Sequence, residues 1–301
     1  MTTILVAGAT GDLGHRIVTA LVAKGADVRV LTRASGSSSG STHRDLEGPH
    51  VTVVEADYDD GPALRAACEG VDAVVSAVNG LRDVIVGAQT ALLEAAVAAG
   101  VPRFVPSDFS ADYRRIPAGS NRNLELRREF AAVLDAAPIR ATSVLNGAFA
   151  DMLSGQAPIV IFDRRLVLFW SHPGQVLDFT TKDDVAAVTA DVALDPDAPR
   201  VVEVAGDRVT SRQLAATLTE LTGERHRLQW AGTTTLLGGV AGLMRRLSHG
   251  DEPFPAWQGM QYLVNMYSGD AQLRHVDRRG RGPSRWTTVR DVLADHLGLP
   301  R

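Results

Sequence analysis

Short apolar runs alternate with helical segments along the first part of the chain. The residues at 4–7 (Ile-Leu-Val-Ala) are all apolar, and Val28, Val30 and Leu31 follow as a second apolar segment, interrupted by Arg29. Runs of this kind are typical of parallel strands that are buried on both faces of a sheet. The stretch from Asp12 to about Lys24 lies between them and has a helical pattern. The pattern therefore predicts a strand, a helix and a second strand.

The same alternation continues to about residue 150. β-branched apolar segments predict further strands, and helices are expected between them. The strands are expected at 51–55, 72–77, 103–106 and 139–142, and the helices at 62–68 and 83–99. Strands that alternate with helices over this length specify an α/β fold with a Rossmann-type, doubly wound parallel sheet. We assign residues 1–150 to this domain.

The alternation stops near Ala148. Two short apolar segments, 159–162 and 166–169, flank Asp163-Arg-Arg165 and predict a β-hairpin, and a strand is expected at 176–180. Thr181 and the acidic residues after it predict a helix start. Later elements are expected at 201–204, 211–221, 225–230, 236–247, 255–267 and 287–297. Residues 151–301 are therefore assigned mainly to a smaller C-terminal α+β lobe for a substrate or a partner.

Three glycines separate the first strand from the first helix. We expect Gly8 to permit a tight turn, Gly11 to let a pyrophosphate approach the backbone at the helix N-terminus, and Gly14 to let the helix pack on the strand. The Gly-x-x-Gly-x-x-Gly spacing is that of short-chain dehydrogenase relatives. A dinucleotide site is predicted, and a glycine-rich turn without a ligand is the alternative.

The end of the second strand selects the cofactor, because the adenine ribose lies there. An NAD site would carry an acidic residue at this point, whereas this chain has Leu31-Thr32-Arg33. The Arg33 guanidinium can pair with a 2′-phosphate, so NADP(H) is favoured. Arg33 could instead be an ordinary solvated arginine. Nearby side chains that could add donors are Ser35, Ser37, Ser38, His43 and Arg44.

Composition narrows the class of protein. The 301 residues are 45% hydrophobic, enough for a sizeable core, and the net charge of −4 gives no general attraction to nucleic acid. Cys68 is the single cysteine, so neither a disulfide framework nor a metal site is expected. We find no signal peptide and no membrane-spanning segment in the pattern, which predicts a cytoplasmic protein.

Several motifs together resemble one known family. They are the opening Gly-Ala-Thr-Gly-Asp-Leu-Gly, Arg33, the segment 103–110 (Arg-Phe-Val-Pro-Ser-Asp-Phe-Ser) and the segment 141–149. This set resembles the NmrA-like and isoflavone-reductase-like branch of the atypical short-chain dehydrogenases, whose Pro-Ser-Glu-Phe turn is similar to 106–109 here. The resemblance implies an NADP(H)-binding Rossmann domain and a smaller lobe that closes a substrate cleft over the nicotinamide. It also implies that a segment near 176–195 returns to the Rossmann domain.

These considerations together define the expected cofactor contacts. They are Gly8, Thr10, Gly11, Asp12, Leu13, Gly14, Arg33, Asp57, Tyr58, Ala77, Val78, Asn79, Pro106, Ser107, Asp108, Phe109 and Arg127. Two of them have alternative interpretations: Asp57 as a helix cap or an adenine contact, and Asp108 as a turn residue or a helix cap.

The usual catalytic pair of short-chain dehydrogenases, Tyr-x-x-x-Lys, is absent, since Tyr113 is followed by Arg, Arg, Ile and Pro. The resemblance places the lysine of the family's reductases at Arg127. An arginine can bond ribose hydroxyls but cannot relay a proton near neutral pH. Tyr113 and His172 are the other candidate acids, with packing and surface roles as their alternatives.

Two functions from different classes remain. The first is an NADPH-dependent reductase of a small apolar or aromatic acceptor, such as a quinone, enone or carbonyl compound. The second is a non-catalytic NADP(H) sensor that binds a partner protein. Under either function the protein is expected to be a monomer or a homodimer. The absence of Tyr-x-x-x-Lys, and the presence of an arginine at position 127 where the family's reductases have a lysine, favour the sensor. A group of methionine and aromatic residues favours the enzyme, because such side chains suit a pocket for an aromatic substrate. Core packing is an equal alternative for this group, which consists of Met244, Trp257, Met260, Tyr262, Met266 and Tyr267.

Overall fold

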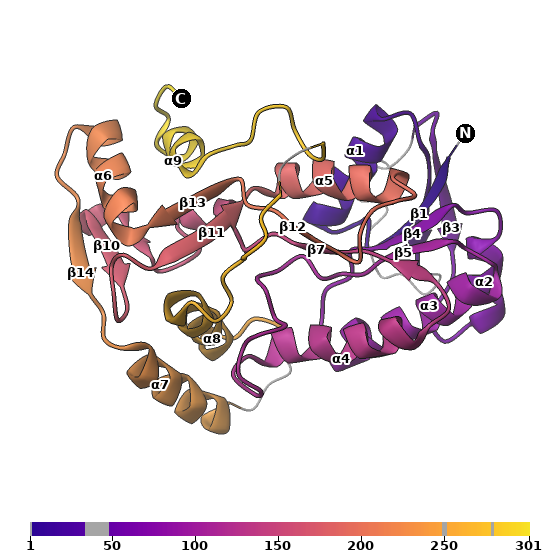
Figure 1. Cartoon of the computed structure of the whole chain (residues 1–301), viewed down its shortest axis with the longest axis horizontal. Coiled ribbons are helices and arrows are strands. Elements are labelled where there is room, and N and C mark those ends of the chain that lie inside the picture. The colour runs from indigo at the N-terminus through magenta and orange to yellow at the C-terminus, as the bar shows by residue number, and fades with distance from the viewer. Residues whose placement is uncertain (1, 34–47, 249–251, 278–279) are drawn as a thin grey trace.

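A six-stranded parallel sheet organises one half of the molecule, and the other half is a smaller lobe (Figure 1). The computed structural model describes residues 2–33, 48–248, 252–277 and 280–301. The predicted 2′-phosphate donors at 35, 37, 38, 43 and 44 therefore lie outside the described residues. In the part of the chain that is described, no helix has both the length and the apolar character that crossing a bilayer requires.

The large sheet has the strand order β3-β2-β1-β4-β5-β6. Its strands are β1 (Thr3–Ala7), β2 (Asp27–Thr32), β3 (Val51–Glu55), β4 (Ala73–Ser76), β5 (Arg103–Val105) and β6 (Arg140–Ala141). All five pairings are parallel. The order reverses between β1 and β4, and ligands of such sheets bind at the carboxyl ends of the strands at this point. The predicted fold class is confirmed.

Helices cover both faces of this sheet because β1 and β4 carry consecutive apolar residues, at 4–7 and 73–75, that point to both faces. Ile4 and Val6 face the layer of α1 (Asp12–Ala23) and α5 (Lys182–Leu194). Leu5 and Ala7 face the opposite layer. That layer contains α2 (Gly61–Cys68), the π-helical segment η2 (Asp83–Ala88), α3 (Gln89–Ala98) and α4 (Arg122–Ala136). Successive strand residues point to opposite faces, so one apolar run supplies both cores.

The helix expected at 83–99 begins in π rather than α form. The side-chain amide of Gln89 donates to the Ile85 carbonyl at 2.6 Å. In an α-helix that carbonyl would accept from the backbone N–H of residue 89. Here the Gln89 N–H instead reaches the carbonyl of Val84, one residue further back.

The smaller lobe is built around two three-stranded sheets. One has the order β13-β11-β8, and the other has the order β14-β10-β9. The strands are β8 (Ala148–Phe149), β9 (Val160–Ile161), β10 (Leu166–Phe169), β11 (Val176–Thr180), β13 (Asp207–Thr210) and β14 (Arg227–Trp230). The predicted hairpin is confirmed, since β9 and β10 pair in antiparallel fashion.

The helices of this lobe surround its sheets (Figure 1). They are η3 (Ala150–Leu153), η4 (Phe162–Arg164), α6 (Ser211–Thr222), α7 (Thr234–Leu247), α8 (Ala256–Ser268) and α9 (Val289–Leu297). The expected sixth strand at 139–142 is shorter than predicted. The chain leaves the large sheet after Ala141, and β7 (Ser143–Leu145) pairs with β12 (Val201–Glu203) instead.

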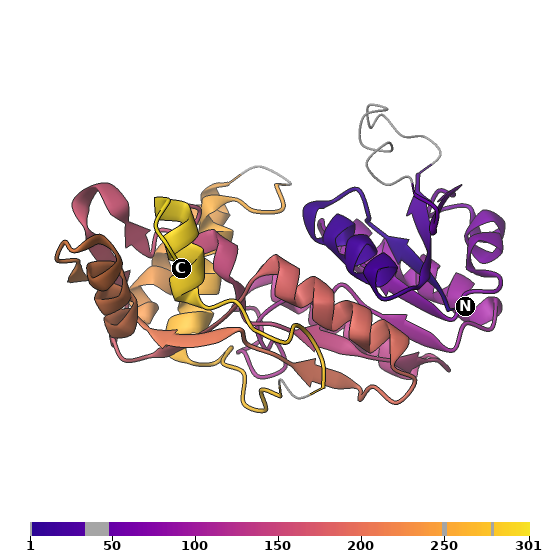
Figure 2. The ribbon, with the colours of Figure 1, turned by 90° about the horizontal axis from the view of Figure 1, so that it is seen from above.

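The segment near 176–195 is divided between the two halves. β11 belongs to a sheet of the smaller lobe, whereas α5 packs beside α1 on the large sheet (Figure 2). Val185 and Val188 share a core with Ile17 and Val18 of α1. The Thr181 side chain accepts a hydrogen bond from the Asp184 N–H and caps α5 as expected.

Candidate functional site

A glycine turn connects β1 to α1 at the carboxyl edge of the large sheet. Gly8 has a φ of +80°, a conformation that side chains disfavour, and a Cβ there would lie 2.6 Å from the Ala77 carbonyl oxygen. Gly11 is the N-cap of α1, and no side chain of the described residues caps this helix. The backbone N–H groups in the first turn of α1 are therefore free of a side-chain cap among the described residues, and residues 10–12 at this helix start are exposed. An anion site at a helix N-terminus requires both features.

The other two glycines differ in what surrounds them. A Cβ on Gly14 would lie 2.2 Å from the Gly8 carbonyl oxygen, so α1 packs directly on the turn. The sequence predicts that Gly14 lets the helix pack on the strand. In the structure it lets the helix pack on the turn that follows the strand. A Cβ on Gly11 would meet only the Gly8 oxygen, at 3.3 Å. The described fold therefore restricts a side chain at position 11 much less than at positions 8 and 14. A ligand that closely approaches the backbone would require a glycine there.

Two further loops lie at the same edge of the sheet. The loop after β4 carries Ala77, Val78 and Asn79, and the loop after β5 carries 106–109. The Ser107 hydroxyl donates to the Val78 carbonyl at 2.7 Å, which joins the two loops. Asn79 is exposed, whereas Phe109 packs into the core beneath the sheet. The structure therefore brings the predicted residues to one edge, but some of them are core residues.

The predicted adenine end of the site lies after β2 and β3. Arg33 is exposed at the end of β2. Burial raises the pKa of Tyr58 to about 12, and the nearby charge of Arg33 opposes that shift. Asp60, not Asp57, caps α2, by accepting from the Ala63 N–H at 3.0 Å. The helix-cap interpretation of Asp57 is therefore wrong, because the helix begins three residues further on.

Asp108 is a buried carboxyl group. Its side chain is 1% exposed, and its Oδ2 accepts from the Tyr113 hydroxyl at 2.8 Å and from the Ser143 hydroxyl at 2.6 Å. Its Oδ1 has no hydrogen-bond partner among the described residues. Burial raises its pKa above the usual range, against the opposing effect of these two hydrogen bonds and of Arg127. The side chain caps no helix among the described residues, so the helix-cap interpretation is wrong. The turn interpretation holds for the backbone, since the Asp108 N–H donates to the Pro106 carbonyl at 2.8 Å.

Tyr113 is not placed to overhang a nicotinamide. It is 3% exposed, and its hydroxyl is bonded to Asp108. Burial and the Asp108 carboxyl raise its pKa well above the usual range, so it holds its proton firmly. Its role is packing and hydrogen bonding, which was the alternative interpretation.

His172 is exposed on the loop between β10 and β11, and its Nδ1 accepts from the Gly174 N–H at 3.0 Å. The neighbouring Ser171 bonds to Gly232 and Thr234. The loop is thus anchored within the smaller lobe, not at the carboxyl edge of the large sheet. The structure does not bring His172 together with the glycine turn.

Arg127 is on α4, is 9% exposed, and donates to the Asn123 carbonyl at 3.1 Å. Its Nε is buried and makes no hydrogen bond within the described residues. Its positive charge acts to lower the pKa of Asp108, which belongs to a network of hydrogen-bonded side chains. The sequence did not identify two other members, Ser143 and Arg200, which are bonded to each other at 2.7 Å. No local motif marks them.

The methionine and aromatic set does not form one lining. Trp257 and Tyr267 are buried, and Tyr267 packs edge-on against Trp170 at 5.3 Å between ring centres. Met244 is exposed. Core packing therefore describes Trp257 and Tyr267. Met266 borders a small cavity of about 10 Å³, which has room for a single water, beside Gly147 and Asp178.

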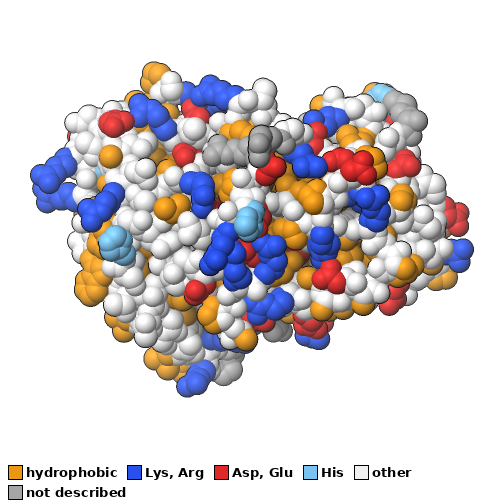
Figure 3. Space-filling model, in the orientation of Figure 1, with side chains coloured by type: hydrophobic (Ala, Val, Ile, Leu, Met, Phe, Trp, Pro, Cys, Tyr) orange, Lys and Arg blue, Asp and Glu red, His pale blue; other side chains and the backbone are white. Residues whose placement is uncertain are grey.

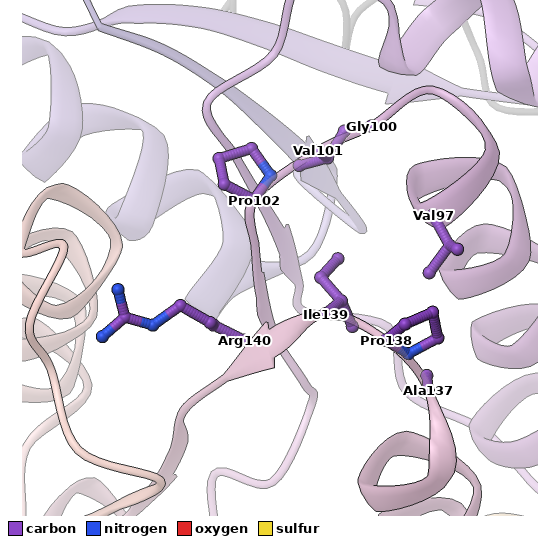
Figure 4. A pocket seen from close by; sticks show the side chains of 8 residues that line it. All are labelled: Val97, Gly100, Val101, Pro102, Ala137, Pro138, Ile139 and Arg140. Atoms are coloured by element: carbon purple, nitrogen blue, oxygen red, sulfur yellow. The ribbon is translucent and has the colours of Figure 1, made fainter.

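A larger open hollow of about 510 Å³ lies elsewhere. It is lined by the ends of α3 and α4 and the starts of β5 and β6, including Val97, Pro102 and Ile139, while Arg140 points away (Figure 4). This is the amino edge of the parallel strands, opposite the glycine turn. It is therefore not the predicted substrate cleft.

The Asp108→Asn variant tests the buried carboxyl group. Folding raises the pKa of Asp108 above its unfolded value of 3.8. The free energy of unfolding of the parent therefore decreases as the pH rises from that value to the pKa of the folded state. The asparagine side chain does not titrate, so the variant carries no such cost. We expect the melting temperature of the variant, relative to the parent, to increase by at least ~2 °C from pH 4 to pH 8. If the difference in melting temperature between variant and parent does not change with pH, the ionisation of Asp108 does not reduce the stability of the fold.

The doubly wound sheet, with an uncapped glycine turn beside its switch point, defines a Rossmann-type fold of the dinucleotide-binding kind. The chain belongs to the NmrA-like family, whose model matches residues 1–238.

Named relatives and solved structures extend this result. Pinoresinol reductase 1 of Arabidopsis thaliana is 32% identical over 208 residues, 65% of each chain, so the match spans about two thirds of that relative. The structure of AtPrR2 with NADP+ and (+)pinoresinol has a TM-score of 0.78 at 24% identity, over 92% of this chain and 91% of that one. An NADPH-dependent quinone oxidoreductase of Escherichia coli has a TM-score of 0.66 at 23% identity, over 99% and 95%. At these identities the two structures show a shared fold.

Proposed function

We propose that this protein is an NADPH-dependent reductase of a small apolar or aromatic acceptor such as a quinone, an enone or a carbonyl compound. The observation that carries the proposal is the exposed, uncapped start of α1 at Gly11. Named relatives that reduce pinoresinol or quinones support this substrate class.

The residues at the sheet edge fit a dinucleotide phosphate group. Gly8 and Gly14 let the turn pack closely against neighbouring backbone, whereas a Cβ at Gly11 would contact one atom of the described residues, the Gly8 oxygen at 3.3 Å. Gly11 is therefore the glycine of this turn at which a pyrophosphate would approach. Arg33 is exposed where a 2′-phosphate would lie, which favours NADP(H) over NAD(H).

The bound cofactor would supply the hydride, so the protein has to orient the two reactants and exclude water. Arg127 would hold ribose hydroxyls through its guanidinium, since its Nε lacks a partner among the described residues. Tyr113 is committed to Asp108, and an arginine does not release its proton near neutral pH. The proton that an acceptor needs would therefore come from solvent.

The test is a binding titration with NADPH together with stopped-flow and steady-state measurements of its absorbance. The panel of acceptors contains quinones, enones and aromatic aldehydes. We expect tight NADPH binding and turnover on at least one acceptor. Failure to bind NADPH would contradict the cofactor assignment.

A second candidate is a non-catalytic NADP(H) sensor that binds a regulatory protein. Arg127 at the expected lysine position and the burial of Tyr113 favour it. Tight NADPH binding without turnover over the whole panel would support the sensor and contradict the reductase.

Arg33→Ala tests the choice of cofactor. Loss of a guanidinium that pairs with a 2′-phosphate should weaken NADPH binding by roughly tenfold or more, and NADH binding by much less. Dissociation constants for both cofactors measure this. Arg65→Ala, on α2, is a control that should leave both constants unchanged. Equal losses for NADPH and NADH in Arg33→Ala would contradict the assignment of Arg33.

A further inference from the structure

Four charged side chains join the first turns of α1 and α5. The Asp12 carboxylate accepts from the Arg16 Nε at 2.7 Å and from the Lys182 Nζ at 2.6 Å. Arg16 also reaches Asp183, so it is shared between two carboxylates. The group is neutral as a whole, with two acidic and two basic members. These hydrogen bonds hold the pKa of Asp12 below its usual range, so its side chain is ionised.

The two helices run side by side in the same direction. The starts of α1 and α5 are joined through Asp12 and Lys182, and their far ends through Lys24 and Asp191 at 2.7 Å. Because α1 begins at the carboxyl edge of the sheet, α5 begins there too (Figure 2). The first turn of α5 therefore lies beside the glycine turn, although it is about 170 residues away in the sequence.

This arrangement has an electrostatic consequence for an anion at Gly11. Asp12 is the next residue, and its negative charge would repel a pyrophosphate at the start of α1. Arg16 cannot offset this charge alone, because it also pairs with Asp183. Lys182 supplies the second positive charge, and its side chain is only 24% exposed.

We propose that Lys182 is a cofactor-positioning residue, which lets an anionic dinucleotide approach Gly11 by cancelling the charge of Asp12 from the neighbouring helix. This inference rests on the proposed cofactor site. It assigns to Lys182, in the C-terminal half of the sequence, a role in phosphate affinity that no residue of the glycine motif provides.

The chain contains a matched control. Lys24 is its other lysine, and it joins the same two helices by an ion pair of similar length at the end away from the glycine turn. If Lys182 only fastens α5 to α1, Lys24→Met and Lys182→Met should have similar effects. If its charge acts on the cofactor, only Lys182→Met should weaken binding.

The experiment is an NADPH titration of the full chain at about 50 and 300 mM salt, with melting temperatures measured in parallel. The proteins are the parent, Lys182→Met, Lys24→Met and the double variant Asp12→Asn with Lys182→Met. We expect Lys182→Met to raise Kd about five- to tenfold at low salt and less at high salt. Lys24→Met should stay within about twofold of the parent, and the double variant should recover most of the loss.

Three results would overturn the proposal while leaving the proposed function intact. They are unchanged NADPH binding in Lys182→Met, an equal loss in Lys24→Met, and a double variant as weak as Lys182→Met alone. A parent protein that binds no NADPH would overturn the proposed function, and this inference with it.

Discussion

Gly11→Val is expected to abolish NADP(H) binding and leave the chain folded. Gly11 has a φ of −81° and a ψ of 158°, which is extended backbone that valine readily adopts. Among the described residues a Cβ would meet the Gly8 oxygen alone, at 3.3 Å, so the turn has to shift by only a few tenths of an ångström to accept a side chain. The valine methyl groups would instead occupy the space through which a phosphate reaches the start of α1. We expect Kd for NADPH to rise by about a hundredfold or more.

Two measurements check this result. The melting temperature should remain within a few degrees of the parent, and circular dichroism should be unchanged. A folded Gly11→Val variant that titrates with NADPH like the parent would show that the phosphates do not approach this turn.

Gly14→Ala is expected to destabilise the fold itself. Replacing a helical glycine by alanine ordinarily stabilises a protein by up to about 1 kcal/mol. Here the new Cβ would lie 2.2 Å from the Gly8 carbonyl oxygen and 2.9 Å from the Ala9 Cα. Both neighbours are backbone atoms, so α1 or the turn must move. We expect a loss of about 3 kcal/mol in the free energy of unfolding and weaker NADPH binding.

Gly259→Ala is the matched control for this substitution. Gly259 lies within α8, is exposed, and a Cβ there would meet no atom within 4 Å among the described residues. The control should therefore show the ordinary gain of alanine in a helix. Chemical denaturation of both variants measures the difference. Gly14→Ala that is as stable as Gly259→Ala would contradict the packing of α1 on the glycine turn.

The charged side chains on one face of the molecule do not favour nucleic-acid binding. On the face shown in Figure 3, basic side chains gather near the junction of the two halves, and acidic side chains lie among them. Arg114, for example, is paired with both Asp112 and Glu203. Such mixed charge gives no continuous positive surface of the kind that binds phosphate backbones.

The sequence by itself determined the large sheet and the glycine turn. The central strands β1 and β4 are short, mostly apolar runs that need cover on both faces, and this requirement appears in the local pattern. The requirement for glycine at Gly14 is also local, because a Cβ there would meet the backbone of Gly8 and Ala9 in the turn itself. At Gly8 the positive φ is local, whereas the close approach of Ala77 belongs to the tertiary structure. The hairpin at 160–169 and the cap at Thr181 depend on neighbouring residues in the same way.

Only the tertiary structure decided the chemistry around the site. Tyr113 looked available next to its motif, but its hydroxyl is bonded to Asp108 and its ring belongs to a core cluster with residues of separate segments, such as Leu145 and Leu273. The burial and the pKa of a side chain depend on what packs around it, and the spacing of residues does not record that. The pairing of Lys182 with Asp12 joins residues 170 positions apart. Such contacts arise when α5 packs on α1, so no local pattern could have announced them.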